Sequence, residues 1–492
     1  MAKAKNQSLE GQRMKYYIHS LICIVIMFGF QFIPPFTDAI THTGMNALGI
    51  FLGVLYGWTF VSMIWPSLLG MVACGFTGLM TVQESFLQGF GADIVIITLF
   101  VFIFAAFMEQ SGLNRWIANW FISRKVVIGR PYVFLAMMVI SAWVLSTFTY
   151  IFAAIIVLWS VFYNISRELG FEKRAPFVNC VLFGIVLGGT LGAITMPFNP
   201  MDVIVLGMMQ SSVGLTVNYV TFSIFNIFFG IIIVILYTLA CKLLFRPDTG
   251  ALSEKVDRFG YLRGEKMNSD QKTALGALLV FLAMLLLPGV LPKTWPVISQ
   301  LATLSVSGSA IVVIIALMIL RDKKSSENEG LLNWGKSAIK GVNWDVIILL
   351  ASTMPISAAL ESDESGVLAA CEKFLKSQIG DMSPLLAIAF ISIALAIITQ
   401  FSHNAVLLII FVPMLCPLVA SYGINPVVMA ITLMFSVQSA LLTPAASTQA
   451  AMIYSNTEWI DKKTIFKLAL CAMIIMLVVA LLGVLPAANI VY

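Results

Sequence analysis

Four long apolar stretches of this chain carry small polar residues or a proline near their middle, and none of the four contains a lysine or arginine. The stretches cover residues 131–163, 177–209, 384–420 and 425–454. Hydroxyl and amide groups donate hydrogen bonds, and interrupted helices offer free N–H and C=O groups, so such positions suit a small anion and a cation. We therefore take as candidate substrate-binding residues Ser146, Thr147, Thr149, Asn199, His403, Asn404, Ser447 and Thr448.

One acidic residue lies close to these polar positions. Asp202 follows Asn199 by three residues inside an apolar run, and acids within membrane segments are costly and usually face a cavity. We predict a cation or proton site at Asp202, with Ser146, Asn199 and Asn404 as further ion-coupling candidates. The alternative is that Asp202 caps the helix that resumes after Pro200.

His403 is the one histidine deep in the chain, and it lies in the third apolar stretch. Its ring can donate a hydrogen bond to a carboxylate, and we expect it to contact the substrate. The alternatives are a proton-coupling site and a neutral imidazole hydrogen-bonded to backbone. The hydroxyl residues have an alternative role too, as polar contacts between helices, which are common in membranes.

The composition is that of a membrane protein. Of the 492 residues, 60% are hydrophobic and 11% are charged, whereas a soluble protein carries about 25% charged residues. At about 20 residues per crossing, the apolar runs suffice for roughly a dozen crossings, and drawing two of them as re-entrant hairpins leaves an all-α polytopic fold with about 11 transmembrane spans. We expect the lipid bilayer as a partner and no nucleic acid, since the net charge of +5 is modest.

The stretch 131–163 is too long for one ordinary span. As a single helix it would extend about 50 Å, whereas the bilayer core is about 30 Å thick. Basic residues flank both of its ends, and positive residues favour the cytoplasmic side. We therefore predict a re-entrant hairpin with its tip near Ser146 to Thr149, and a second one in 384–420 with its tip near Gln400 to Asn404.

With both stretches drawn as hairpins, the basic residues fall almost entirely on one side. Of the 29 lysines and arginines, only Lys293, Lys373 and Lys376 lie in segments assigned to the outside. This asymmetry predicts a multi-pass protein of a plasma membrane, of the bacterial inner-membrane type, with a cytoplasmic N-terminus and an external C-terminus.

The same order of landmarks occurs twice in the chain. Asp93 and Asp345 each open an apolar run, and a hairpin and then an interrupted stretch follow in both copies. The first run starts outside and the second inside. We therefore predict inverted repeats in 1–245 and 273–492, joined by a cytoplasmic loop at 246–272. Paired interrupted segments of this kind are typical of secondary transporters.

Around these landmarks the chain resembles the divalent anion/sodium symporter family of the ion transporter superfamily, from about residue 45 to the C-terminus. That family has Ser-Asn-Thr at its hairpin tips and Thr-Pro-Pro-Asn in its broken helices. Here GGTLGAITMPFN, residues 188–199, resembles the approach to the first broken helix, and Ser447-Thr448-Gln449-Ala450 stands at the second. Leu145-Ser146-Thr147 and His403-Asn404-Ala405 stand at the tips, where Thr147 and Asn404 match the motif by type.

The resemblance implies a homodimeric carrier of small organic anions, di- or tricarboxylates, whose hairpin domain moves like an elevator. Sodium ions are the one inorganic ligand that it implies, and we expect no other metal or cofactor. Because both tips depart from Ser-Asn-Thr, we expect a weaker sodium dependence, with coupling to sodium, to protons or by exchange left open.

Other classes of protein remain as alternatives. The first is a cation/proton antiporter of the same superfamily, with Asp202 and His403 as the coupling pair. A channel is less favoured, because two opposed broken segments favour alternating access. An enzyme is disfavoured, since the chain contains neither Gly-x-Ser-x-Gly nor His-Glu-x-x-His.

Overall fold

The computed structural model is all-helical, as the sequence predicts. The residues that it describes are 2–253, 266–292, 294–321, 329–370, 373, 377, 382–401, 404–444 and 446–492. Within these ranges the only β-type pairing is an isolated bridge between Arg321 and Gly330. The chain divides into two compact units, and each unit takes residues from both halves of the sequence. This division by contacts differs from the division into repeats, which stays a prediction.

The first unit comprises Met1–Ile96, Asn343–Ala387 and Ile409–Gly423. Its core forms where α17 packs against the three helices α2, α3 and α4. Close backbone contact accompanies this packing, because a Cβ on Gly89 would lie 2.4 Å from the carbonyl oxygen of Ala351. Among the described residues, the helices that lie wholly in this unit are α1 (Ala2–Gly29), η1 (Phe30–Phe32), α2 (His42–Phe60), α3 (Ile64–Cys74), α4 (Val82–Phe90) and α17 (Trp344–Glu361).

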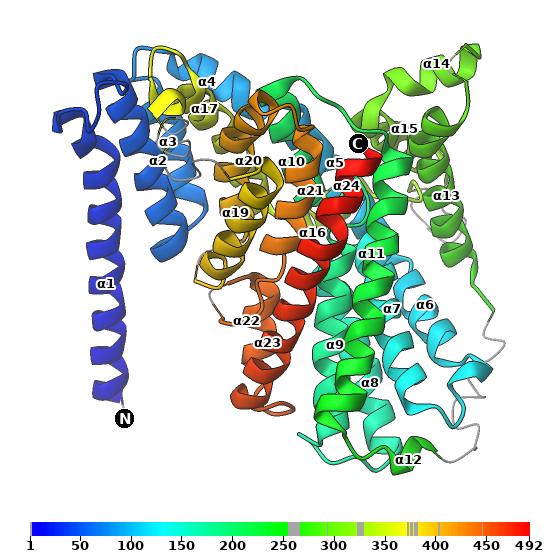
Figure 1. Ribbon diagram of the computed structural model, residues 1–492. Coiled ribbons are helices and arrows are strands. Elements are labelled where there is room, and N and C mark those ends of the chain that lie inside the picture. Colours follow the sequence, from blue (N-terminus) through cyan, green and yellow to red (C-terminus); the bar gives the residue numbers. More distant parts are fainter. Residues whose placement is uncertain are drawn as a thin grey trace. The chain divides into compact units, whose positions relative to one another are not determined.

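The second unit comprises Ile97–Val342, Ile388–Leu408 and Ile424–Tyr492. It holds three of the four interrupted stretches whole and residues 388–408 of the stretch 384–420 (Figure 1). Its first helices are α6 (Leu113–Ile122), η2 (Lys125–Val127), α7 (Pro131–Phe148), α8 (Ile151–Glu168), α9 (Pro176–Gly192), α10 (Pro200–Val213), α11 (Tyr219–Ala240), η3 (Cys241–Phe245) and α12 (Gly250–Ser253). The later ones are α13 (Ser269–Val290), α14 (Pro296–Thr303), α15 (Ser305–Ile319), α16 (Trp334–Gly341), α21 (Pro426–Val437), α22 (Thr448–Ser455), α23 (Lys462–Val479), η5 (Ala480–Val484) and α24 (Leu485–Val491). Three more helices contribute residues to both units: α5 (Asp93–Gln110), α19 (Pro384–Ile398) and α20 (Asn404–Ser421).

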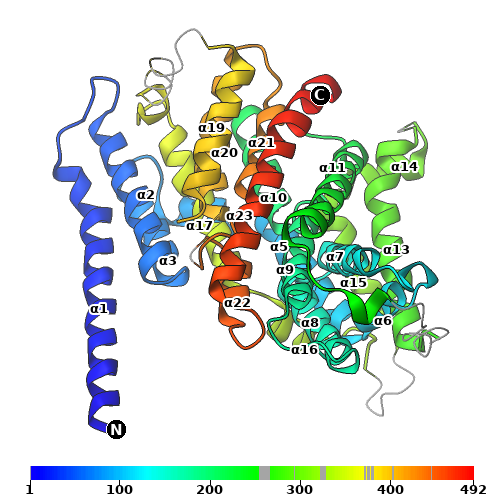
Figure 2. The same ribbon diagram turned by 60° about the horizontal axis from the view of Figure 1, so that its bottom comes forward.

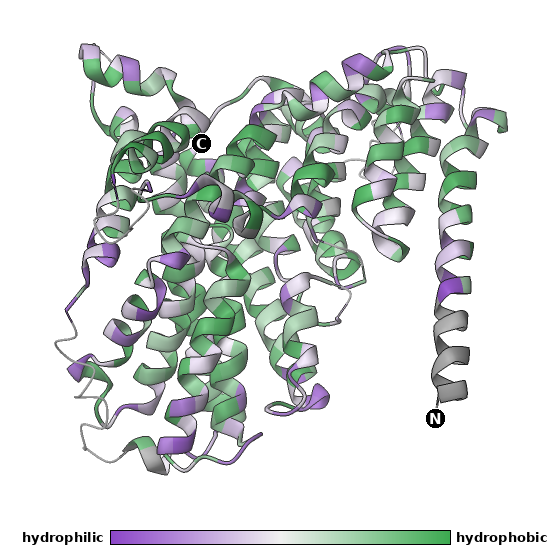
Figure 3. Ribbon diagram, turned by 180° about the vertical axis from the view of Figure 1, so that it is seen from behind, coloured by the Kyte–Doolittle hydropathy of each residue, from purple (hydrophilic) through white to green (hydrophobic). Residues whose placement is uncertain are grey.

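Many helices are long and apolar enough to cross a bilayer. In the described part of the chain eight pass this test, or nine if the bent pair α14 and α15 counts as one span. The sequence predicts one span near 298–320, but the helix axis turns by 99° between α14 and α15. Polar residues gather at helix ends and in loops, while apolar residues cover the helix middles (Figure 3).

Three glycines one helical turn apart let α7 lie directly on α9. A Cβ on Gly188 would lie 2.2 Å from the carbonyl oxygen of Val139, and one on Gly192 would lie 1.8 Å from Oγ of Ser146. Gly184 faces the side chain of Val139 in the same way. Small residues at such spacing allow close approach of membrane helices, so α7 and α9 are in backbone contact along their length.

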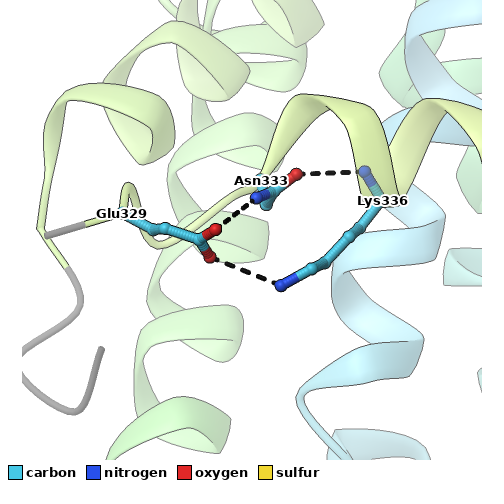
Figure 4. A network of polar contacts seen from close by, with 3 residues as sticks. All are labelled: Glu329, Asn333 and Lys336. Atoms are coloured by element: carbon cyan, nitrogen blue, oxygen red, sulfur yellow. Dashed lines mark hydrogen bonds and ion pairs between the residues drawn. The ribbon is translucent and has the colours of Figure 1, made fainter. Parts of the chain in front are cut away.

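The start of α16 is held by a small polar network (Figure 4). Asn333 caps the helix, because its Oδ1 accepts a hydrogen bond from the backbone N–H of Lys336 at 3.0 Å. Its Nδ2 donates to Oε1 of Glu329 at 3.0 Å, and Nζ of Lys336 lies 3.4 Å from Oε2 of the same glutamate. The network fixes the entry of the chain into α16.

Candidate functional site

The first helix break separates α7 from α8 at Thr149 and Tyr150. Helix α7 ends at Phe148, and Thr149 has extended dihedral angles of −138° and 174°. The hydroxyls of Ser146 and Thr147 both donate to the carbonyl oxygen of Trp143, at 3.1 and 2.8 Å, and that of Thr149 donates to Leu145 at 2.7 Å. All three hydroxyl protons are thus engaged, whereas the oxygens keep lone pairs that suit a cation.

The second break lies between α9 and α10 and covers residues 193–199. Asn199 precedes Pro200, and a residue before proline disfavours helical angles, so the chain is extended there. The Nδ2 of Asn199 donates to the carbonyl oxygen of Gly192 at 2.6 Å and so ties the two ends of the break together. From α7, the indole N–H of Trp143 donates to Oγ1 of Thr195 at 2.7 Å.

Asp202 lies in the first turn of α10 and is fully buried. Neither of its carboxylate oxygens accepts a hydrogen bond from any described residue. The carboxylate therefore does not cap α10 in this structure, which removes the alternative role that the sequence left open. A buried carboxylate without partners is costly, although the positive end of a helix dipole favours it. Binding of a cation or a proton would relieve that cost.

The third break lies between α19 and α20, where Asn404 is the first helical residue. Its Nδ2 donates to Oε1 of Gln438 at 2.8 Å, and its Oδ1 accepts from the backbone N–H of Ala405 at 2.9 Å. Ser402 and His403 lie outside the described residues, so the predicted contact between His403 and the substrate stays a prediction.

The fourth break lies between α21 and α22 and covers residues 438–447. Gln400, at the end of α19, holds this segment: its Nε2 donates to the carbonyl oxygen of Ser439 at 3.2 Å, and its Oε1 accepts from the N–H of Leu442 at 3.0 Å. Ser447 caps α22, since its Oγ accepts from the N–H of Ala450 at 3.1 Å. Thr448 differs from the other candidates that the structure describes, because it is exposed whereas they are buried.

Each hairpin tip contacts the broken helix that follows it in the chain, and both contacts lie within the second unit. The tip near Ser146 lies against Gly192, and Gln400 and Asn404 are bonded to residues 438–442. The two broken helices pack against each other by opposite halves: α10, the second half of one, packs against α21, the first half of the other, and α22 packs against α9. The geometry thus brings polar groups from all four interrupted stretches into a single unit.

Two further polar residues belong to this arrangement. Gln438 is buried, and its Nε2 has no hydrogen-bond partner among the described residues, so it offers a donor at the fourth break. Thr195 is buried in the second break, and its Oγ1 accepts a hydrogen bond from the indole N–H of Trp143. The signal for Gln438 was present in the sequence, as an amide inside an apolar stretch without charges.

An all-helical chain with many membrane-length apolar helices, several of them interrupted, has the architecture of a polytopic membrane protein. The family model described as the sodium:sulfate symporter transmembrane region matches residues 14–487, and the chain belongs to this family. This confirms the predicted membership of the divalent anion/sodium symporters. The chain is a multi-pass membrane transporter.

Individual relatives agree with this placement. The sodium-dependent dicarboxylate transporter SdcS of Staphylococcus saprophyticus is 22% identical over 477 residues, covering 94% of this chain and 89% of that protein. The Na(+)/dicarboxylate cotransporter 3 of Rattus norvegicus is 30% identical over 135 residues, which cover 27% of this chain and 21% of that protein. Among solved structures, the YdaH transporter of Alcanivorax borkumensis has the same fold, with a TM-score of 0.58 at 13% identity over 92% of this chain and 99% of that chain.

Proposed function

We propose that this protein is a secondary active carrier of small dicarboxylates that couples transport to a cation bound at Asp202. The observation that carries the proposal is the fully buried carboxylate of Asp202, which lies beside a helix break and has no partner among the described residues. The substrate class follows from the relatives, two of which are named as dicarboxylate transporters.

The polar groups at the breaks suit a dianion and a cation in different ways. The side-chain amides of Gln438 and Asn404 supply N–H donors for a carboxylate. The hydroxyl oxygens of Ser146, Thr147 and Thr149 have given their protons to backbone carbonyls and therefore act as acceptors. A sodium ion among these oxygens would offset the charge of a substrate that no arginine or lysine of the four stretches neutralises.

We further propose movement of the elevator type, in a homodimer. The hairpin tips and both broken helices fall in one compact unit, which supports a shared motion of the whole substrate site. Movement of that unit would carry the substrate without opening the individual helix contacts.

The test is uptake by purified protein in proteoliposomes. Succinate, citrate, sulfate and phosphate are offered singly, with a sodium gradient, with a pH gradient and with neither. We expect succinate uptake that depends on a cation gradient. Uptake of sulfate without succinate would assign a different substrate, and proton-driven sodium flux without any anion would establish the antiporter instead.

A variant pair isolates the role of Asp202. Asp202→Asn removes the charge and keeps the shape, and we expect it to abolish the dependence of uptake on the cation gradient. Asp345→Asn makes the same chemical change at an exposed position at the start of α17 and serves as the control. Unchanged coupling in a folded Asp202→Asn protein would contradict the proposed cation site.

A further inference from the structure

An apolar cavity, different in character from the polar breaks, lies between α7 and α11. Its volume is about 760 Å³, and it is open on one side. The two helices pack against each other, as Figure 2 shows. The cavity follows their length, since its lining runs from Tyr132 to Phe148 in α7 and from Ile227 to Leu239 in α11. Two α11 residues on its rim, Ile231 and Ile235, are 48% and 52% exposed. Both residues belong to the candidate membrane span Tyr219–Phe245, where exposed apolar side chains suit contact with lipid.

The walls of this groove are apolar along their length. Met137, Ile140 and Trp143 from α7 face Ile231 and Ile235 from α11. Such a surface offers no charged or free donor group for a dicarboxylate along its length, and it reaches the proposed transport site only at its end, where Thr147 and Thr195 lie. It does match a hydrocarbon chain, whose only requirement is apolar contact along an extended path.

The hydroxyls at the edges of the groove do not change this character. Those of Thr147 and Thr238 donate to carbonyls of their own helices, at 2.8 and 2.8 Å, and that of Thr195 donates to Leu191 at 2.7 Å. Their donors are therefore occupied. The charged residue of the lining, Lys242, lies at the opposite end of the groove from Thr147.

That end carries Lys242, whose Nζ lies 5.8 Å from the ring centroid of Tyr132. Three more exposed basic residues are close in sequence to lining residues at this end. Lys125 precedes Val126, Arg130 lies two residues before Tyr132, and Arg246 lies one turn beyond Lys242. An apolar groove with a basic mouth at a helix end has the charge and shape of a phospholipid site. Basic pockets between membrane helices bind anionic headgroups in this way.

We propose that the groove between α7 and α11 binds an anionic phospholipid. The phosphate lies at Lys242, and one acyl chain runs between the helices toward Thr147 and Thr195. The long stem of Lys242 lies along apolar surface while its ammonium group reaches the headgroup. Because the indole of Trp143 lines the groove and also bonds to Thr195, the acyl chain touches a residue that holds the second helix break.

Native mass spectrometry of the purified full-length protein tests the headgroup contact. The probes are phosphatidylglycerol and phosphatidylcholine with identical acyl chains. We expect preferential retention of phosphatidylglycerol, and Lys242→Gln should weaken it about fivefold, which corresponds to one lost basic contact at a membrane surface. Lys467→Gln, at an exposed lysine of α23 that does not line the groove, is the control and should change nothing.

A second pair of variants tests the acyl-chain path without touching the charge. Ile231→Trp fills the groove from an exposed position and should displace the retained lipid. Ile224→Trp places the same side chain on α11 at a residue that is 62% exposed and does not line the groove, and it should leave retention intact.

Three results would overturn the proposal. The first is equal retention of the two lipids by the wild-type protein, which would mean nonselective surrounding lipid only. The second is unchanged retention in both Lys242→Gln and Ile231→Trp. The third is full competition by glycerol phosphate, which has no acyl chains and would reveal a simple anion site.

Discussion

The side-chain amide of Asn404 donates a hydrogen bond to Oε1 of Gln438 at 2.8 Å, joining the first residue of α20 to the end of α21. This bond leaves Nε2 of Gln438 buried and without a partner among the described residues. The pair therefore presents an oriented N–H donor at the fourth break, where an anion would complete its hydrogen bonding.

Loss of either partner should weaken substrate binding. Hydrogen bonds to charged groups contribute about 1.5–3 kcal/mol, so Asn404→Ala and Gln438→Ala should each raise the half-saturating succinate concentration about ten- to a hundredfold. Thr147→Ala should act in the same direction through the first tip. Initial uptake rates over a range of concentrations measure this effect. Asn333→Ala, in the network at the start of α16, is the control, and unchanged affinity in the first three variants would exclude the tips from the site.

Asp202 predicts a link between stability and sodium. Sodium should raise the melting temperature of the wild-type protein in detergent, and a concentration about 100 times the Kd corresponds to about 2.7 kcal/mol. Asp202→Asn should lose this response. Its melting temperature without sodium should not fall, since the carboxylate has no hydrogen bond to lose among the described residues. A sodium response that survives the substitution would place the cation elsewhere.

The contact between α7 and α9 predicts a steric effect. In Gly188→Ala the new Cβ would lie 2.2 Å from the carbonyl oxygen of Val139, so the helices must separate. Overpacking of this kind costs about 1–3 kcal/mol and should lower the melting temperature. Gly276→Ala in α13 meets no atom within 4 Å and is the matched control. Equal melting temperatures for the two variants would contradict the close packing.

Asp461 caps the start of α23, and this cap predicts a loss of protein stability in acid. Hydrogen bonds from the Thr464 hydroxyl and from backbone N–H groups hold the pKa of Asp461 below its usual value. The stabilisation is therefore complete above the unfolded-state pKa of about 4 and is lost as pH falls through the lower, folded-state pKa. Melting temperatures measured from about pH 7 to about pH 3 should fall more steeply for the wild type than for Asp461→Asn, whose neutral cap does not titrate. Parallel curves would show that this cap has no part in the acid response.

Membrane orientation is predicted by the basic residues alone. Single cysteines introduced in a cysteine-free protein within 246–272 should resist an impermeant maleimide in intact cells, whereas a cysteine in place of Tyr492 should react. Labelling of both positions from the same side would contradict a model with an odd number of spans.

Local signals in the sequence reveal where helices stop. Pro200 after Asn199 indicates the second break, because a proline disfavours helical angles in the residue before it. Ser447 indicates the start of α22, because its side chain caps backbone N–H groups within the next few residues. The structure accordingly has helix ends inside each of the four stretches that the polar residues single out. The helical, membrane-spanning class followed from composition in the same way.

Partners distant in sequence could not be predicted from one chain. Trp143 meets Thr195 across 52 residues, and Asn404 meets Gln438 across 34, and neither pairing has a local pattern. The 99° turn between α14 and α15 was also missed, since the apolar run continues through it. Side chains of one type can serve either a substrate or a neighbouring carbonyl, and only geometry separates the two roles.

The glycine contact between α7 and α9 bears on how such a carrier can diversify. Main-chain atoms meet there, so the position of the tip is set by helix axes and not by the side chains that the tip presents. Ser146 is constrained by this contact, since its Oγ lies against Gly192, whereas Thr147 approaches that glycine with its backbone. Substitutions at positions such as Thr147 can therefore change which solute is recognised while the helix contact keeps its shape, whereas enlarging a single glycine of the contact would displace the recognition groups of that tip together.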